Sequence, residues 1–220
     1  MATFTATAGS NSTIGYAQYG STTWNKGTSN GACQGAYQGT SASASRVGMM
    51  FFSGAGAALR GKIITNITLK ITSSSAGSGS TSKKLTFHKA NYQTFNTSVK
   101  GSAQVGDTLG TLTGKFYGNT ATHTLNESTN TALFNAMKAY FAAGNSVLII
   151  YNGETSSSSS YSSNYQWWHL HRGNSLNASE HVCLFCGKSF RTNRPQKYCS
   201  HDCYIKGRFD KQHESYAHAI

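Results

Sequence analysis

Residues 63–72, with the sequence IITNITLKIT, alternate in character with a period of two. Successive side chains of a β-strand point to opposite sides, so this segment divides into an apolar face and a more polar face. The apolar face consists of Ile63, Thr65, Ile67, Leu69 and Ile71, and the other of Ile64, Asn66, Thr68, Lys70 and Thr72. The pattern predicts a strand buried on one side, which requires a sheet packed against a core.

Two later segments predict further strands. Residues 83–88 (KKLTFH) follow the Ser- and Gly-rich stretch SSSAGSGSTS and place Leu85 and Phe87 on one face. We therefore expect them to form a hairpin with residues 63–72. Residues 165–171 (YQWWHLH) also predict a strand, with one face made of Tyr165, Trp167 and His169 and the other of Gln166, Trp168 and Leu170.

Two short apolar runs predict strands of a different kind. Residues 46–52 (RVGMMFF) and 147–151 (VLIIY) are apolar over most of their length. Such runs are typical of strands covered on both faces in the core of a sandwich. The Gly- and Tyr-rich residues 15–39, in contrast, predict mostly loops with short strands.

One helix is expected before the second apolar run. Apolar residues recur there at three- and four-residue spacing, namely Leu133, Phe134, Met137, Tyr140 and Phe141. Ser128 or Thr129 can cap the start of this helix, and Gly144 can end it. The apolar stripe predicts a contact with the core that closes one end of a sandwich.

The composition indicates a folded chain without membrane insertion. Of the 220 residues, 38% are hydrophobic and 12% aromatic, and large aromatic side chains supply core area where aliphatic ones are few. No apolar run reaches the roughly 18 residues that a membrane span requires. The first residues, MATFTATAGS, lack the basic and apolar segments of a secretory signal, so we expect synthesis in the cytosol.

The net charge of +12 arises mainly from a shortage of acids, because residues 1–175 contain 12 Lys+Arg and 3 Asp+Glu. Such a surface suits anionic partners, either cell-wall polymers or DNA. Glycoside hydrolysis usually needs two facing carboxylates, and these residues offer only Asp107, Glu127 and Glu154. Glu127 is already explained by the dipole of the predicted helix. We therefore expect a protein that is not an enzyme.

The order of these segments resembles the jelly-roll domains of bacteriophage tail-fibre and virion proteins, which are related to the DNRLRE family of surface β-sandwiches. The resemblance spans about residues 3–172 and is carried by RVGMMFF, LRGKIITNITLKITSSSAGSGS, KKLTFHKA, the helix, VLIIYNGE and YSSNYQWW. It implies a mainly β fold over residues 1–175, namely a jelly-roll-like β-sandwich with one helix. These motifs contain no catalytic signature.

Residues 176–220 contain four cysteines at the spacing of a metal site. Cys183 and Cys186 are separated by two residues, and Cys199 and Cys203 by three. Two such pairs can offer four thiolates to a tetrahedral Zn²⁺. Two disulfides or free thiols are the alternative, but cytosolic synthesis and the odd fifth cysteine favour zinc. The fifth, Cys33, is expected to be a small buried residue or a free thiol.

The pattern CxxCGKxF…KYCSxxC resembles treble-clef zinc fingers, including those beside DNA-processing domains of phages and bacteria. The resemblance implies a small C-terminal zinc finger over residues 176–220. Seven basic residues lie between or after the cysteine pairs: Lys188, Arg191, Arg194, Lys197, Lys206, Arg208 and Lys211. They can contact phosphates, so a nucleic-acid-associated protein is the alternative function. Docking to a partner protein, or stabilisation, is the favoured role of the finger.

Together these features predict a bacteriophage virion protein, assembled in the bacterial cytoplasm, that serves in the tail fibre, in receptor binding or in head decoration. Its expected partners are other virion proteins, further copies of itself within the particle, and a glycan of the host cell surface. Exposed aromatic rings would bind such a glycan, because ring faces stack on the apolar faces of sugars. The candidates surround the Ser-rich residues 156–165 and are Tyr161, Tyr165, Trp167 and Trp168.

Overall fold

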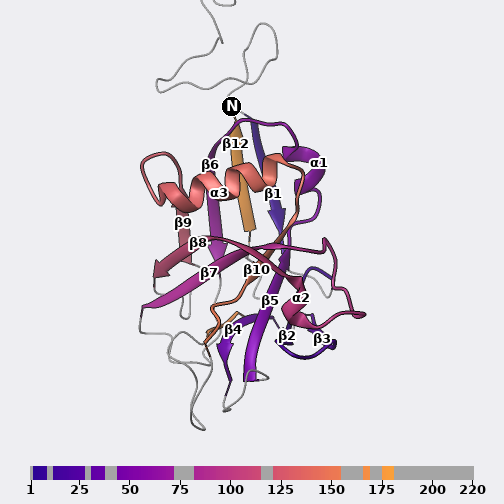
Figure 1. The fold of residues 1–220 in the computed structure, drawn as a ribbon. Helices are drawn as coiled ribbons and strands as arrows, with labels where there is room; N and C mark the ends of the chain where they lie inside the picture. The colour runs from indigo at the N-terminus through magenta and orange to yellow at the C-terminus, as the bar shows by residue number, and fades with distance from the viewer. Residues whose placement is uncertain are drawn as a thin grey trace, which may run out of the picture.

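The computed structural model describes residues 2–8, 12–27, 31–37, 44–71, 82–114, 121–154, 166–168 and 175–180. Within these ranges the chain is mainly β, and every strand pairing is antiparallel (Figure 1). A four-stranded sheet has the order β1 (Ala2–Thr7), β12 (Ser175–Glu180), β6 (Ile64–Ile71) and β9 (Ala121–Leu125).

A second, larger sheet has eight strands. Its main path runs β11 (Gln166–Trp168), β4 (Ala32–Ala36), β5 (Ser45–Phe51), β10 (Val147–Ile150), β7 (Lys83–Ala90) and β8 (Val105–Gly114). Off this path, β2 (Ile14–Gln18) pairs with both β5 and β3 (Trp24–Lys26). The three helices of the described ranges are α1 (Ala55–Leu59), α2 (Gly101–Gln104) and α3 (Thr131–Ala142).

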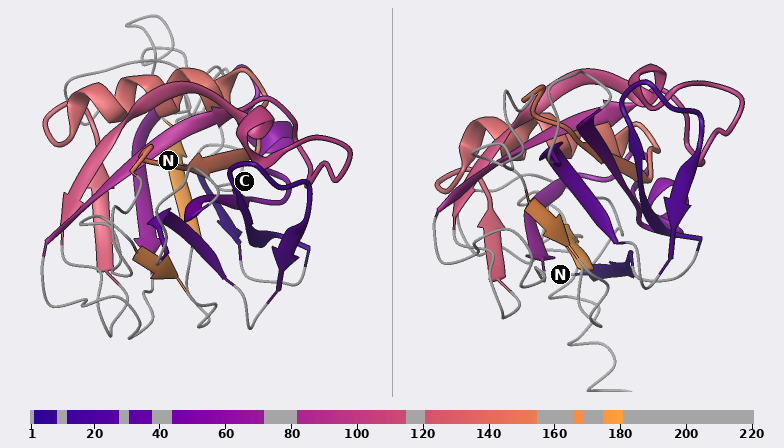
Figure 2. Two further views of the ribbon diagram at one scale, coloured as in Figure 1. Left: turned by 60° about the horizontal axis from the view of Figure 1, so that its bottom comes forward. Right: turned by 90° about the horizontal axis from the view of Figure 1, so that it is seen from below.

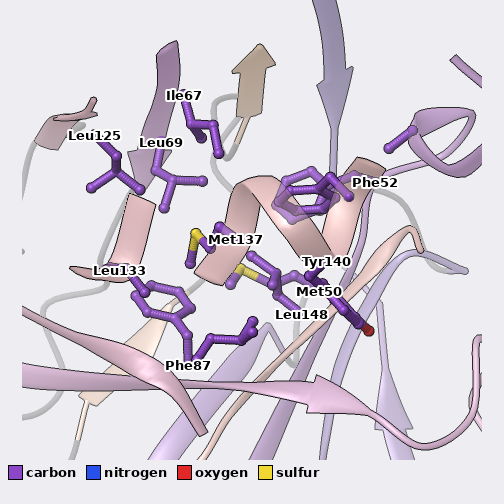
Figure 3. Packing of buried hydrophobic residues seen from close by; sticks show 14 of the residues in the cluster. Met50, Phe52, Ile67, Leu69, Phe87, Leu125, Leu133, Met137, Tyr140 and Leu148 are labelled. Carbon is purple, nitrogen blue, oxygen red and sulfur yellow. The ribbon is translucent and has the colours of Figure 1, made fainter. Parts of the chain in front are cut away.

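The two sheets face each other across one core, which is the arrangement of a β-sandwich (Figure 2). Ile67 and Leu69 of the small sheet and Phe87 of the large sheet belong to the same buried cluster. Leu133 and Met137 of α3 point into this cluster from one end (Figure 3). The mainly β fold predicted from the sequence is therefore confirmed.

The two apolar runs are covered on both faces, as predicted. In β10, Leu148 and Ile150 face the core between the sheets, whereas Val147 and Ile149 belong to a second cluster. That second cluster lies on the outer face of the large sheet and includes Trp24, with Phe95 packed against it. The rings of Trp24 and Phe95 are arranged edge to face, with their centroids 5.1 Å apart. Neither face of this strand meets water, so its sequence shows no alternation.

The long helix is confirmed, with one correction. The five residues of its predicted apolar stripe are the buried ones. The N-cap, however, is Asn130 and not Ser128 or Thr129, because the side chain of Asn126 accepts the backbone N–H groups of both these residues in the preceding turn. Gly144, at φ 96°, follows the C-cap as expected.

The prediction of a single helix is wrong, since α1 and α2 are also present in the described ranges. The two have five and four residues. Each is too short to show a helical period in its sequence, because one amphipathic repeat needs about seven residues. Contacts with neighbouring strands and with α3 fix them instead.

The alternation in residues 63–72 is confirmed in its second half and shifted in its first. Ile67, Leu69 and Ile71 are buried, but at the start Ile64 is buried in place of Ile63. The register explains the shift, because Ser179 of β12 pairs with Asn66 whereas Glu180 pairs with Ile64. Two consecutive residues of β12 thus pair with residues of β6 that are two positions apart, which leaves Thr65 as an extra residue in a β-bulge. A bulge moves the side chains that precede it to the opposite face of the sheet.

The predicted hairpin between residues 63–72 and 83–88 is wrong. Strand β6 pairs with β12 and β9 in the small sheet, whereas β7 pairs with β10 and β8 in the large sheet. Leu85 and Phe87 do face inward as predicted. Alternation reports only which face is buried, and a sandwich can bury both strands by placing them in opposite sheets.

Strand β12 carries the small sheet past the predicted domain boundary at residue 175. It lies between β1 and β6 and pairs with each of them over its length (Figure 1). Residues up to Glu180 therefore belong to the β-sandwich. The four cysteines of the predicted finger lie outside the described residues.

Candidate functional site: a tyrosine–arginine row on the large sheet

Strands β2, β5 and β4 lie side by side at the end of the molecule opposite α3 (Figure 1). Arg46 of β5 pairs with Gln18 of β2 on one side and with Gly35 of β4 on the other. Tyr16 and Tyr37 each lie two residues from these partners, so both are diagonal neighbours of Arg46. We call Tyr16, Arg46 and Tyr37 the tyrosine–arginine row.

The guanidinium of Arg46 contacts both rings of the row. Its Cζ atom lies 5.7 Å from the ring centroid of Tyr16 and 5.5 Å from that of Tyr37, within the range of cation–π attraction. Tyr16 and Arg46 are half-buried, and Tyr37 is 36% exposed. The row therefore offers an exposed ring at its rim and a cation held beside it.

Two glycines make room for the row. Gly35 pairs with Arg46, and Gly48 pairs with Tyr16. Because glycine has no side chain, neither position places one between the two rings. Gly48 is also required by the packing, since a Cβ there would lie 2.6 Å from Cγ1 of Ile150 and 2.7 Å from the carbonyl oxygen of Cys33. The strands thus approach closely beneath the row.

Two polar side chains hold these strands in place. Gln34 of β4 donates its amide to the carbonyl of Lys84 at 2.6 Å and accepts the N–H of Thr86 at 3.3 Å. It thereby joins β4 directly to β7 beyond the end of β10. On β5, Ser45 Oγ donates to the carbonyl of Glu154 at 2.6 Å. These bonds fix the backbone that carries the row.

The surroundings of Tyr16 favour the protonated form of its hydroxyl group. Burial and the neighbouring Cys33 raise the pKa of Tyr16, although Arg46 acts in the opposite direction. Burial also raises the pKa of Cys33, which is 1% exposed and forms no disulfide. Cys33 is thus the small buried thiol that the sequence predicted, and a neutral buried thiol is a poor metal ligand.

Two of the four predicted saccharide-binding residues, Trp167 and Trp168, lie on a strand next to β4. Strand β11 pairs with β4, so that Trp167 stands opposite Cys33 and Trp168 opposite Ala32. The strand predicted in this region is confirmed as β11. Both tryptophans therefore lie on the strand next to β4. Tyr161 and Tyr165 lie outside the described residues.

The row itself was missed by sequence reasoning. Tyr16 and Tyr37 belong to the Gly- and Tyr-rich region for which mostly loops were predicted, and Arg46 begins an apolar strand. No local spacing links these three residues, because only the pairing of three strands brings them together. A Tyr-rich segment with a single Arg nearby is too common a signal to indicate a site.

A second aromatic group lies on the outer face of the large sheet. The rings of Tyr19 and Tyr151 are stacked, with their centroids 4.9 Å apart. Burial, and the neighbouring Tyr19, raise the pKa of Tyr151 to about 12. Beside them, the two ring nitrogens of His88 lie 3.0 Å from the carbonyl oxygen of Gly106 and 2.8 Å from that of Tyr151. This group ties β7, β8 and the end of β10 together, which is a structural role.

A groove of about 690 Å³ lies between α3 and strands β7 and β8. On the α3 side it is lined by Ala136, Ala139 and the buried Tyr140, and by Ala143 directly after the helix. Lys89 and Asp107 line its other side. These two form an exposed ion pair at 3.0 Å. The groove contains no exposed aromatic ring, so it is less suited to a sugar than the tyrosine–arginine row.

Two acidic side chains among the described residues form separate ion pairs. Asp107 pairs with Lys89, and Glu127 pairs with Lys138 at 3.7 Å on a different part of the surface. Among the residues that the structure describes, no group of three His, Cys, Asp or Glu side chains could hold a metal ion. The predicted zinc ligands Cys183, Cys186, Cys199 and Cys203 lie outside those residues.

Comparison with known proteins assigns no family. No protein-family model and no curated protein matches the chain. None of the helices in the described ranges is both long and apolar enough to cross a membrane. The fold and the row therefore define the class of protein only as a mainly β protein with antiparallel sheets and an aromatic, cationic surface at one end.

Proposed function

We propose that the chain is a non-enzymatic structural protein of a bacteriophage particle that binds a saccharide of the host cell surface. The tyrosine–arginine row, placed at one end of the β-sandwich and next to β11, is the observation that carries this proposal. In the particle, the protein serves either as a tail-fibre or receptor-binding subunit or as a head decoration. The proposal includes a jelly-roll-like topology for the sandwich.

The chemistry of the row suits a sugar. The partly exposed ring of Tyr37 can stack on the apolar face of a pyranose, and the guanidinium of Arg46 can donate hydrogen bonds to its hydroxyl groups. Arg46 lies on a paired strand, and Tyr37 directly follows one and donates its backbone N–H to the carbonyl of Ala44. Because the backbone at both positions is held, less conformational entropy is lost on binding. Trp167 and Trp168 on the adjacent strand are proposed to extend the platform, together with Tyr161 and Tyr165.

Saccharide binding is testable with the full-length chain on a glycan array. We expect Tyr37→Ala to weaken binding by about threefold to tenfold, since one aromatic contact contributes about 0.5–1.5 kcal/mol. Tyr92→Ala is a matched control, because Tyr92 is 38% exposed but lies outside the row. The pair Trp167→Ala/Trp168→Ala should weaken binding further. An array without hits, or equal losses for Tyr37→Ala and Tyr92→Ala, contradicts the proposal.

The C-terminal segment is proposed to be a zinc finger that docks the protein onto other virion proteins or stabilises it. Its four cysteines supply a tetrahedral thiolate set, and synthesis in reducing cytosol leaves them available for Zn²⁺. A small, metal-fixed and basic module can seat in an acidic socket of a partner. Several copies would then be arranged within one particle.

The zinc prediction concerns both metal content and folding. We expect one equivalent of zinc per reduced full-length chain, and a loss of that zinc in Cys199→Ser, because three thiolates bind the ion far less tightly. Elemental analysis measures the metal, and Cys33→Ser serves as the control because Cys33 is buried in the sandwich. A zinc content below about half an equivalent in the unaltered protein would reject the site.

A further inference from the structure

His88 of β7 reaches two neighbouring segments through the two nitrogen atoms of its ring. Nδ1 lies 3.0 Å from the carbonyl oxygen of Gly106 in β8, and Nε2 lies 2.8 Å from that of Tyr151, directly after β10. A carbonyl oxygen only accepts hydrogen bonds, so each nitrogen must carry a proton to bond its partner. Only the imidazolium cation has two N–H groups, because a neutral imidazole has one. The geometry therefore fits the charged form of the ring.

The neutral ring can form only one of the two bonds. If its proton stays on Nε2, the bond to Tyr151 remains and the lone pair of Nδ1 faces the carbonyl oxygen of Gly106. Thr108 Oγ1 lies 3.4 Å from Nδ1 and can then donate its proton, but this distance is long for a hydroxyl donor. The carbonyl of Gly106 no longer receives a bond from His88 in this form.

The charged and titratable groups around His88 leave the two carbonyls as its polar partners. The ring centroid of Tyr151 lies 6.0 Å from that of His88, and Tyr19 stacks on Tyr151. The raised pKa of Tyr151, about 12, keeps its hydroxyl group neutral. Lys89 and Asp107 pair with each other beside the groove under α3. Within the described part of the chain, no carboxylate bonds the ring of His88.

We propose that His88 is a pH-sensitive cross-link, which joins β7 to β8 and to the end of β10 by two hydrogen bonds when protonated and by one when neutral. Hydrogen bonds made by the charged form of a group favour that form, whereas the half-buried position of the ring opposes it. The unfolded chain has neither carbonyl in place, so the folded chain holds this proton more tightly. The contribution of His88 to stability is then present at low pH and is lost as the pH rises.

Urea denaturation of the full-length chain and of His88→Gln, at about pH 5 and about pH 8, measures this contribution. These two values bracket the range in which imidazole titrates, and glutamine does not titrate. We expect His88→Gln to lower the folding equilibrium constant by about threefold to tenfold more at the lower pH than at the higher one, as for one net hydrogen bond. Other titratable groups are present in both chains, so their effects cancel in the comparison.

Two further variants separate this mechanism from general effects of pH. Thr108→Val removes the hydroxyl group that can bond the neutral ring, so it should increase the loss of stability at the higher pH. His123→Gln is the matched control with the opposite sign. Burial lowers the pKa of His123, so the stability that this group contributes is lost as the pH falls. Its replacement should therefore cost less stability at about pH 5 than at about pH 8.

Nitrogen NMR of the unaltered chain tests the same point without a variant, and it still decides if His88→Gln fails to fold. At about pH 5, both ring nitrogens of His88 should show the chemical shift of a protonated nitrogen. A single protonated nitrogen at that pH overturns the proposal. Equal losses of stability for His88→Gln at the two pH values also overturn it, because the ring would then hold the strands together irrespective of its charge.

Discussion

A chain that ends at residue 180 is expected to keep the cooperative unfolding of the β-sandwich, whereas a chain that ends at residue 175 is expected to lose it. Strand β12 is a middle strand of the small sheet, and its six residues pair with β1 on one side and with β6 on the other. Removal of this strand leaves β1 without its partner in the sheet and exposes an edge of β6. Two rows of backbone hydrogen bonds are lost together.

The two truncated chains differ by five residues and serve as controls for each other. Thermal unfolding followed by circular dichroism should give a sharp transition for residues 1–180 and a broad, weak one for residues 1–175. Equal transitions for both chains would show that β12 contributes little to the sandwich. The chain of residues 1–180 is also the one to use for testing whether the proposed finger anchors the protein in particles. It lacks the four cysteines of the finger but keeps all of strand β12.

Phe87→Ala is expected to destabilise the sandwich by about 3–5 kcal/mol, the cost of deleting a large aromatic side chain from a packed core. Phe87 is fully buried and lies where the two sheets meet α3, close to Leu133 (Figure 3). The cavity would be lined by residues of three elements, so the surroundings cannot collapse into it without moving a whole strand or the helix.

Urea denaturation of the full-length chain measures this effect through the midpoint and slope of unfolding. Tyr92→Ala is the control, because its partly exposed ring lies outside both buried clusters and should change stability by no more than about 0.5 kcal/mol. A loss below about 1 kcal/mol for Phe87→Ala would mean that the two sheets do not share the tight core described above.

Local sequence patterns determined much of the architecture. The two-residue period of β6 and β7, the continuous apolar runs of β5 and β10, and the helical stripe of α3 all predicted the correct type of element. These features are local, because burial of one face imposes a period on the residues of the segment itself. The spacing of the four cysteines is likewise local, and the zinc site drawn from it remains a prediction.

Only the tertiary structure decided which segments pair and what their pairing brings together. The bulge in β6, the placement of β6 and β7 in opposite sheets, and the insertion of β12 between β1 and β6 depend on contacts between distant residues. The tyrosine–arginine row has the same origin, because its three residues lie on or beside three different strands. A strand sequence specifies a buried face but neither a partner nor a register, and both are set by how the completed core packs.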